Sequence, residues 1–232
     1  MKIRIIASVF FCCVAYTVAK TQGMGIGYNF NLGWQNYIET GDDYSQQRYM
    51  MMHEAYVRYH NITGQNSVQI GVGIRKDNIS FSNFSQFLDH DGITIDRYYN
   101  EGTIDRFAWR FSLSDNLQFG GKPGGLLLAL SGGMYLEYTF EMVRNDLEGD
   151  YEYTLNDEIY PFNPGIMLGI ETRMKWLTFG YRFEKPFMDM LDHDYINSLR
   201  LRTDNSTELR GLRLGASTSV FYIGISLDFF SE

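Results

Sequence analysis

Residues 25–34 read GIGYNFNLGW, and this stretch decides the fold because apolar side chains recur at every second position. The apolar face carries Ile26, Tyr28, Phe30, Leu32 and Trp34, whereas glycine and asparagine occupy the other face. Strict alternation with a period of two predicts a β-strand with one apolar and one polar side.

The same alternation recurs along the rest of the chain. It is found in 54–60, 67–75, 106–113, 126–141, 166–173, 176–184 and 220–229. The apolar parity changes between Leu214 and Phe221, which fits either a bulge in one last strand or a tight turn near 217–219. Because single-chain bacterial barrels favour even strand numbers, we expect eight strands, with ten as the alternative.

The connections between these stretches alternate in length. The long connections are 35–50, 77–102, 143–162 and 186–207, and the short ones are 62–66, 114–124 and 174–175. This rhythm is typical of an all-β, antiparallel, up-and-down transmembrane barrel with short turns at one end and long loops at the other. We therefore expect four long external loops.

The first residues form a separate unit. Lys2 and Arg4 precede an apolar run over 5–18, and Ala19 is a small residue suited to a cleavage site. This pattern predicts a secretory signal peptide over 1–19, followed by the barrel over 20–232. Both cysteines, Cys12 and Cys13, lie in the apolar run, so the mature chain would carry no thiol. No later segment reaches about 18 consecutive apolar residues, so only strands could cross a membrane.

Alternation alone does not say which face meets lipid, because a soluble lipocalin-like barrel has the same period with its apolar face inward. Three features favour lipid on the apolar side. Lysines after the signal peptide lie in turns or near strand ends, and bulky aromatic residues such as Trp34 and Trp109 recur near strand ends, as in interfacial girdles. The polar face, in turn, pairs arginines with acids, which suits a confined ion-pair network. We expect this network to fill the lumen and to consist of Glu54, Arg58, Arg75, Arg106, Arg110, Glu137, Glu141, Glu171, Arg173, Arg182, Glu184 and Asp228.

With these features the chain resembles the small eight-stranded outer-membrane barrels of the OmpA/OmpX kind, and most of all the PorT-like outer-membrane β-barrel proteins of Bacteroidetes-type bacteria. The resemblance covers the whole mature chain and implies a bacterial outer-membrane location. The aromatic last strand, from Phe221-Tyr222-Ile223 to Phe229-Phe230, resembles the terminal signal read by the barrel-assembly machinery, although Ser231 and Glu232 follow it.

The net charge of -8 argues against a nucleic-acid binder, which would carry a basic face. The expected partners are outer-membrane lipid and, during insertion, the barrel-assembly machinery. We expect no cofactor, and the pattern identifies no surface ligand.

One repeated tetrapeptide is a candidate for chemistry at the rim. Leu-Asp-His-Asp occurs in two of the long loops, and its polar residues are Asp89, His90, Asp91, Asp192, His193 and Asp194. Together they could bind a metal or act as a general base, as in a rim-site protease or lipid A-modifying enzyme. Coincidence in Asp-rich loops is the simpler interpretation. We therefore expect a non-enzymatic protein with a structural or surface-binding role, with the rim enzyme and a narrow channel as alternatives.

Overall fold

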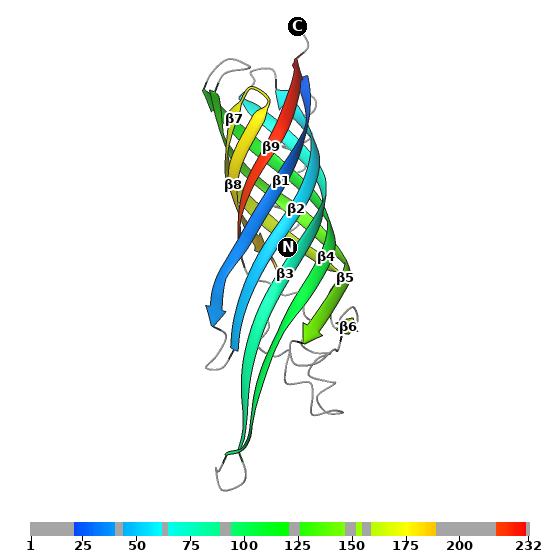
Figure 1. Cartoon of the computed structure of the whole chain (residues 1–232). Helices are drawn as coiled ribbons and strands as arrows, with labels where there is room; N and C mark the ends of the chain where they lie inside the picture. Colours follow the sequence, from blue (N-terminus) through cyan, green and yellow to red (C-terminus); the bar gives the residue numbers. More distant parts are fainter. Residues whose placement is uncertain are drawn as a thin grey trace, which may run out of the picture.

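The chain forms a closed antiparallel β-barrel (Figure 1). The computed structural model describes residues 21–39, 44–61, 65–88, 94–120, 126–146, 152–154, 159–188 and 217–230. The predicted signal peptide over 1–19 lies outside these residues, as do Asp89, His90, Asp91, Asp192, His193 and Asp194. Within the described ranges, no helix is long and apolar enough to span a bilayer.

Eight strands make the wall of the barrel, as the alternation predicts. They are β1 (Thr21–Glu39), β2 (Tyr44–Asn61), β3 (Asn66–Leu88), β4 (Thr94–Gly120), β5 (Leu126–Asp146), β7 (Phe162–Met174), β8 (Leu177–Pro186) and β9 (Thr218–Phe230). Each strand pairs with its neighbours along the chain, and β9 pairs with β1 to close the wall. The short β6 (Glu152–Thr154) adds only to the end of β5. The expected eight-stranded barrel is confirmed. The region before residue 217, where the parity changes, lies outside the described residues.

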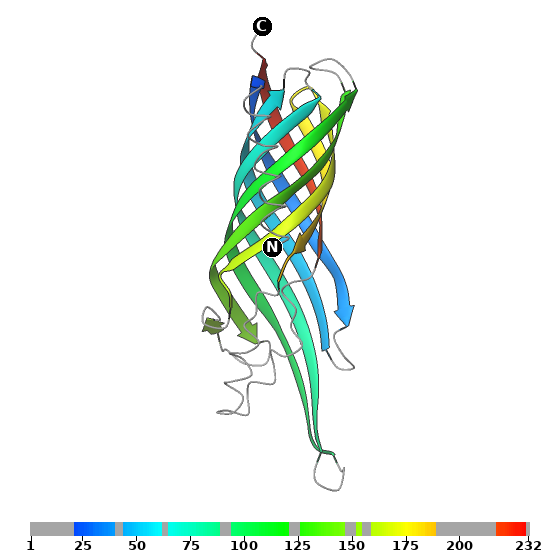
Figure 2. The same cartoon turned by 180° about the vertical axis from the view of Figure 1, so that it is seen from behind.

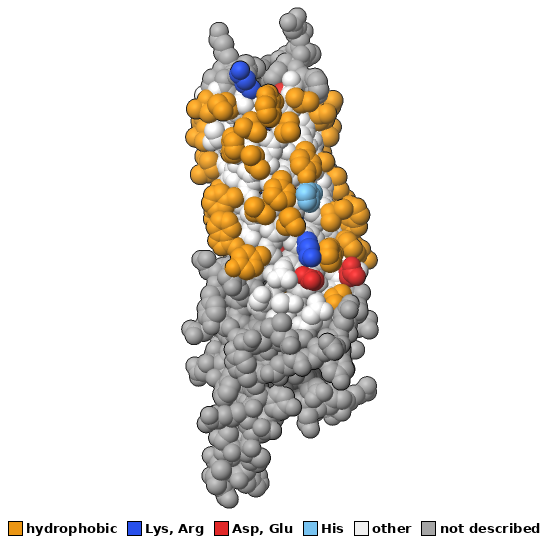
Figure 3. Space-filling model, viewed as in Figure 1, with side chains coloured by type: hydrophobic (Ala, Val, Ile, Leu, Met, Phe, Trp, Pro, Cys, Tyr) orange, Lys and Arg blue, Asp and Glu red, His pale blue; other side chains and the backbone are white. Residues whose placement is uncertain are grey.

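The outer surface of the barrel is apolar and the interior is charged. Leu32, Phe111 and Leu168 face outward with 50%, 52% and 60% of their side chains exposed, whereas the inward-facing Arg58 and Arg106 are fully buried. On the face seen in Figure 3, exposed hydrophobic side chains gather in a band over the barrel wall, and all eight wall strands carry such side chains. A lipocalin-like barrel would have the opposite arrangement. An apolar exterior, a polar interior and a wall without open edges are the architecture of a membrane-spanning barrel.

Two of the four expected long loops are mostly strand. β1 continues to Glu39 and β2 begins at Tyr44, so most of 35–50 is a hairpin. Likewise β3 and β4 extend through most of 77–102 and pair with each other as far as Leu88 and Thr94. The barrel therefore has a short-turn end, where the connections are 62–65, 121–125 and 175–176, and a long-hairpin end. At the long-hairpin end β3 and β4 project beyond the other strands (Figures 1 and 2).

Candidate functional site

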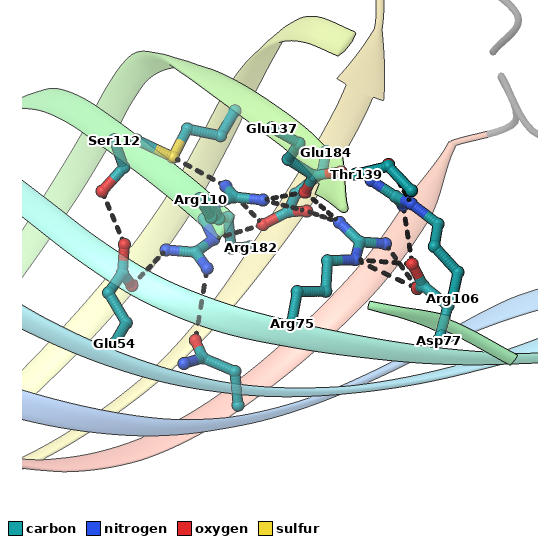
Figure 4. Close-up of polar contacts among 12 residues, drawn as sticks. Glu54, Arg75, Asp77, Arg106, Arg110, Ser112, Glu137, Thr139, Arg182 and Glu184 are labelled. Carbon is teal, nitrogen blue, oxygen red and sulfur yellow. Dashed lines mark hydrogen bonds and ion pairs between the residues drawn. The ribbon is translucent and has the colours of Figure 1, made fainter. Parts of the chain in front are cut away.

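Charged side chains from five strands meet in the lumen and form what we call the central cluster (Figure 4). Its members lie at inward-facing positions of neighbouring or opposite strands, and none is more than 6% exposed. They are Arg48 and Glu54 of β2, Arg75 and Asp77 of β3, Arg106 and Arg110 of β4, Glu137 of β5, and Arg182 and Glu184 of β8.

Glu137 accepts hydrogen bonds from three arginines. Arg75 Nη1 and Arg110 Nη1 donate to Glu137 Oε1 at 2.6 and 3.1 Å, and Arg106 Nη2 donates to Glu137 Oε2 at 2.5 Å. Charge-assisted bonds of this kind are short and are about twice as strong as neutral ones. Glu137 therefore ties β5 to β3 and β4 through the interior as well as through the sheet.

Asp77 holds a second set of arginines in the same way. Arg48 Nη2 lies 3.0 Å from Asp77 Oδ2, Arg75 Nη2 lies 2.9 Å from Oδ1, and Arg106 Nη1 lies 2.7 Å from Oδ2. Arg75 and Arg106 bind both Asp77 and Glu137, so the two carboxylates share their partners. The cluster is thus one connected network and not a set of separate ion pairs.

Glu184 connects this network to the other side of the barrel. Arg110 Nη2 lies 2.8 Å from Glu184 Oε1, and Arg182 Nε donates to the same atom at 2.8 Å. Arg182 Nη1 in turn lies 3.3 Å from Glu54 Oε2. Ser112 Oγ donates to Glu54 Oε1 at 2.5 Å, which satisfies the other oxygen of that carboxylate.

A smaller charged group, the second cluster, lies nearer the short-turn end. Arg58 Nη2 and Arg173 Nη2 both lie 2.9 Å from Glu171 Oε1. Arg173 Nη1 also reaches Asp228 Oδ2 at 2.8 Å, and His60 Nε2 lies 3.1 Å from Asp228 Oδ1. Each carboxylate of this cluster therefore has at least one cationic partner.

Tyrosine rings fill the space around the arginines by lying over glycines of adjacent strands. A Cβ atom on Gly27 would lie 2.2 Å from Tyr56 Cζ, one on Gly165 2.3 Å from Tyr135 Cζ, and one on Gly180 2.1 Å from Tyr222 Cζ. The ring of Tyr135 also lies under Arg110, with Cζ of the guanidinium 4.1 Å from the ring centroid. Glycine at these wall positions gives the rings room to lie across the lumen.

Toward the long-hairpin end the interior changes from charged to apolar. Ile79 of β3, Ile104 of β4 and Met142 of β5 follow the central cluster on the inward face, and all three are fully buried. An eight-stranded barrel is only just wide enough for its own side chains. The lumen is therefore packed along its length with paired charges, tyrosine rings and, at the long-hairpin end, aliphatic side chains.

The alternation places Glu141 in the lumen, but the structure places it on the outer surface. β5 carries a bulge here: Ala108 pairs with Thr139 and Phe107 pairs with Glu141, so Phe140 is the extra residue. The extra residue reverses the parity, which turns Glu141 outward and buries Met142. The other eleven residues expected in the network face the interior and lie in the two clusters.

Arg48 and Asp77 complete the central cluster but were not expected from the sequence. Both lie in stretches assigned to loops, 35–50 and 77–102. The signal was present in β2, where Arg48, Met50, Met52 and Glu54 continue one inward face without interruption. Among the described residues, no group of three or more His, Cys, Asp and Glu side chains is arranged to hold a metal ion.

The second candidate site is the part of the β3–β4 hairpin that projects beyond the barrel, which we call the arm. β2 pairs with β3 only as far as Asn83, and β5 pairs with β4 only from Gly102. Residues 84–88 and 94–101 form the arm, and in the described part of the chain they pair only with each other. Among the described residues, no strand pairs with either outer edge of the arm, and we call these the open edges.

The packed lumen predicts that the barrel does not conduct ions. Purified protein in planar lipid bilayers should give no stable single-channel steps, because the buried, ion-paired side chains of the central cluster occupy the lumen of a barrel that is only just wide enough for them. Stable steps of reproducible size from pure protein would show that the lumen opens, and would favour the narrow-channel alternative.

No protein-family model matches the chain, and no curated protein sequence matches it significantly. Among solved structures, the chain is similar to the N-terminal β-barrel domain of OprF from Pseudomonas aeruginosa, with 10% identity, a TM-score of 0.37, and coverage of 89% of this chain and 98% of that chain. It is also similar to Neisserial surface protein A, with 9% identity, a TM-score of 0.36, and coverage of 88% and 95%. For the translocator domain of the autotransporter NalP from Neisseria meningitidis, the identity is 8%, the TM-score 0.35, and the coverage 97% and 95%. The eight-stranded barrel is established by the strand pairing of this chain itself.

Proposed function

We propose that the protein is a bacterial outer-membrane barrel that does not conduct and that binds an extended polypeptide at the cell surface through the arm. The apolar band and the closed wall support the membrane location, because lipid offers no partners for open backbone groups. Since barrels of this kind have short periplasmic turns and longer extracellular connections, the arm would lie outside the cell. A closer kinship with the PorT-like barrels stays a prediction.

The observation that supports binding is the open edge of the arm. An exposed strand edge presents a row of backbone donors and acceptors that can pair with another chain. Natural proteins usually protect such edges with proline or lysine. Residues 84–88 (FSQFL) contain no proline and no charged residue, and residues 94–101 (TIDRYYNE) contain no proline and no lysine, although Asp96, Arg97 and Glu101 are charged. The two segments supply aromatic residues at Phe84, Phe87, Tyr98 and Tyr99. This composition suits strand addition, in which backbone hydrogen bonds are supplemented by side-chain contacts.

Shortening the arm should abolish binding without unfolding the barrel. Asn83 and Asn100 are paired across the hairpin, so an Asn-Gly turn placed directly between them closes the shortened hairpin with a favoured geometry. The probe is an immobilised unfolded polypeptide, reduced and carboxymethylated lactalbumin, with binding measured by surface plasmon resonance. The native protein should bind and the shortened variant should lose most of the signal.

The matched control keeps the arm but protects its edge. This double variant carries Tyr98→Lys and Ser85→Lys, at two positions that are paired across the hairpin. It should bind the polypeptide more weakly, because lysine blocks pairing at a strand edge. Both variants should keep the different gel mobilities of heated and unheated samples that mark a folded barrel. Equal binding by native and shortened protein, or no binding by the native protein, would contradict the proposal.

A further inference from the structure

A histidine lies on the lipid-facing surface of the barrel, within the apolar band (Figure 3). His53 is exposed, and its partners across the sheet are Phe30 of β1 and Ile74 of β3. The outward-facing positions of β2 run from Tyr49 to Tyr59, with His53 between them. At about 3.3 Å per residue, His53 lies roughly 13 Å along the strand from Tyr49, which a tilt of about 40° reduces to roughly 10 Å along the membrane normal, inside a band about 25 Å tall.

His53 is hydrogen-bonded to a second outward-facing polar group. Tyr28 Oη and His53 Nδ1 form a hydrogen bond. Tyr28 can reach His53 because its own partner across the sheet is the small Ala55. The ring of Phe30, the partner of His53 on β1, also lies beside the imidazole, with ring centroids 5.2 Å apart. The imidazole is thus held in place on the outer surface.

The hydrogen bond leaves one donor and one acceptor unused, whichever tautomer is present. If Tyr28 donates to Nδ1, the imidazole keeps the Nε2 hydrogen and the tyrosine oxygen keeps a lone pair. If Nδ1 donates to the tyrosine, the hydroxyl hydrogen remains as donor and Nε2 as acceptor. Acyl chains satisfy neither group, and unsatisfied polar groups in an apolar medium cost several kcal/mol each.

A second copy of the chain would satisfy both groups at once. Two barrels inserted in the same direction are related by a two-fold axis along the membrane normal, and such a contact places the same surface of each copy against the other. The unused donor of each Tyr28–His53 pair then meets the unused acceptor of the other. A surface that carries one unused hydrogen-bond donor and one unused acceptor is complementary to a second copy of itself.

The surface beside the pair is shaped for close approach. An apolar depression of about 690 Å³ adjoins Tyr28 and is bordered by Ile26, Val57, Ile70 and Val72, with Ala55 between the larger side chains. Small residues allow membrane-embedded elements to approach closely, and polar side chains then join them across the interface. We propose that the β1–β3 face around Tyr28 and His53 is a contact between two copies of this barrel within the membrane. This inference goes beyond the proposed surface binding and is independent of it.

Cysteine cross-linking in lipid vesicles tests the contact. In the full chain with Cys12→Ser and Cys13→Ser, Ile74→Cys places a thiol beside His53 on the outer surface, where Ile74 is 43% exposed. Leu168→Cys is the matched control, because Leu168 is 60% exposed on β7, which lies across the barrel from β2, the strand that carries His53. At low protein-to-lipid ratio, mild oxidation should give disulfide dimers for the Ile74 variant and few for the Leu168 variant.

Adding His53→Phe to the Ile74→Cys chain separates the hydrogen bonds from the shape of the surface. Phenylalanine keeps an aromatic ring beside Phe30 but removes the polar atoms, so dimer formation should fall about tenfold or more while the barrel stays folded by its gel mobility. Equal cross-linking at both cysteines, or no effect of His53→Phe, would overturn the proposal. A His53-dependent phospholipid on monomeric protein in native mass spectrometry would also overturn it, because lipid would then be the partner.

Discussion

Glu137→Ala is expected to be the most damaging single substitution in the barrel. It removes the carboxylate that accepts hydrogen bonds from Arg75, Arg106 and Arg110 and leaves three buried guanidinium groups short of a partner. Removing one member of a buried ion pair costs about 3–5 kcal/mol, because the remaining charge stays buried and uncompensated. Urea unfolding of the protein in lipid vesicles, followed by tryptophan fluorescence, should show a loss of unfolding free energy in this range.

Glu141→Ala is the matched control on the same strand. Glu141 lies beyond the bulge and is exposed, so its removal should change the unfolding free energy by no more than about 0.5 kcal/mol. The comparison also tests the bulge itself, because a regular β5 would place both carboxylates in the lumen. Similar losses for the two variants would mean that the interior is not arranged as the central cluster requires.

The wall of the barrel could be predicted from sequence because lipid imposes a strong contrast between the two faces of each strand. In β5, for example, Leu126, Leu128, Leu136 and Tyr138 all face outward as the alternation requires. Every strand crosses the same apolar medium, so every strand carries the same signal. The pairing of neighbours then follows, because antiparallel strands joined by short connections lie side by side.

The ends of the strands could not be predicted, because the contrast disappears where strands leave the bilayer. Along β3 the outward-facing residues change from Ile74 to Lys76, Asn78 and Ser80, and Lys76 pairs with Asp105 at 3.9 Å. A strand that faces water on its outer side needs no apolar residue there. The extended parts of β3 and β4 therefore have the composition of a loop, although they are paired strands, and the alternation does not identify Asp77 as a lumen residue.

Bulges and isolated polar residues limit prediction in a different way. At Phe140 a single extra residue reverses the facing of Glu141 and Met142, and apolar residues at 140 and 142 make the alternation look uninterrupted. His53 has the same parity as Ala55 and Val57, so the pattern does place it outward. Its importance appears only with the Tyr28 hydrogen bond, which depends on how the two strands are paired.

Gly180→Ala is expected to lower stability because the lumen has no room for the added methyl group. The new Cβ would lie 2.1 Å from Tyr222 Cζ and 2.3 Å from Tyr222 Oη, so the ring must move. The ring is held, because its hydroxyl donates to Glu171 at 3.2 Å and Arg182 lies over its face at 5.6 Å from the centroid. Overpacking of this kind costs about 1–3 kcal/mol, and a lost hydrogen bond to the charged Glu171 adds to it.

A double-mutant cycle with Tyr222→Ala shows whether the clash is the cause. Removing the ring alone should destabilise the barrel, but in the Tyr222→Ala background Gly180→Ala should cost little, because the space above it is empty. The two changes should therefore couple by about 1 kcal/mol or more. Gly132→Ala is the control for the same glycine-to-alanine change at a position with room. Its Cβ would lie 3.6 Å from Leu168 Cδ2, an ordinary contact, so this substitution should leave the unfolding free energy nearly unchanged. The loss of stability could be equal for Gly180→Ala in the native chain, for Gly180→Ala in the Tyr222→Ala background, and for Gly132→Ala. The loss would then come from the backbone and not from the ring over Gly180.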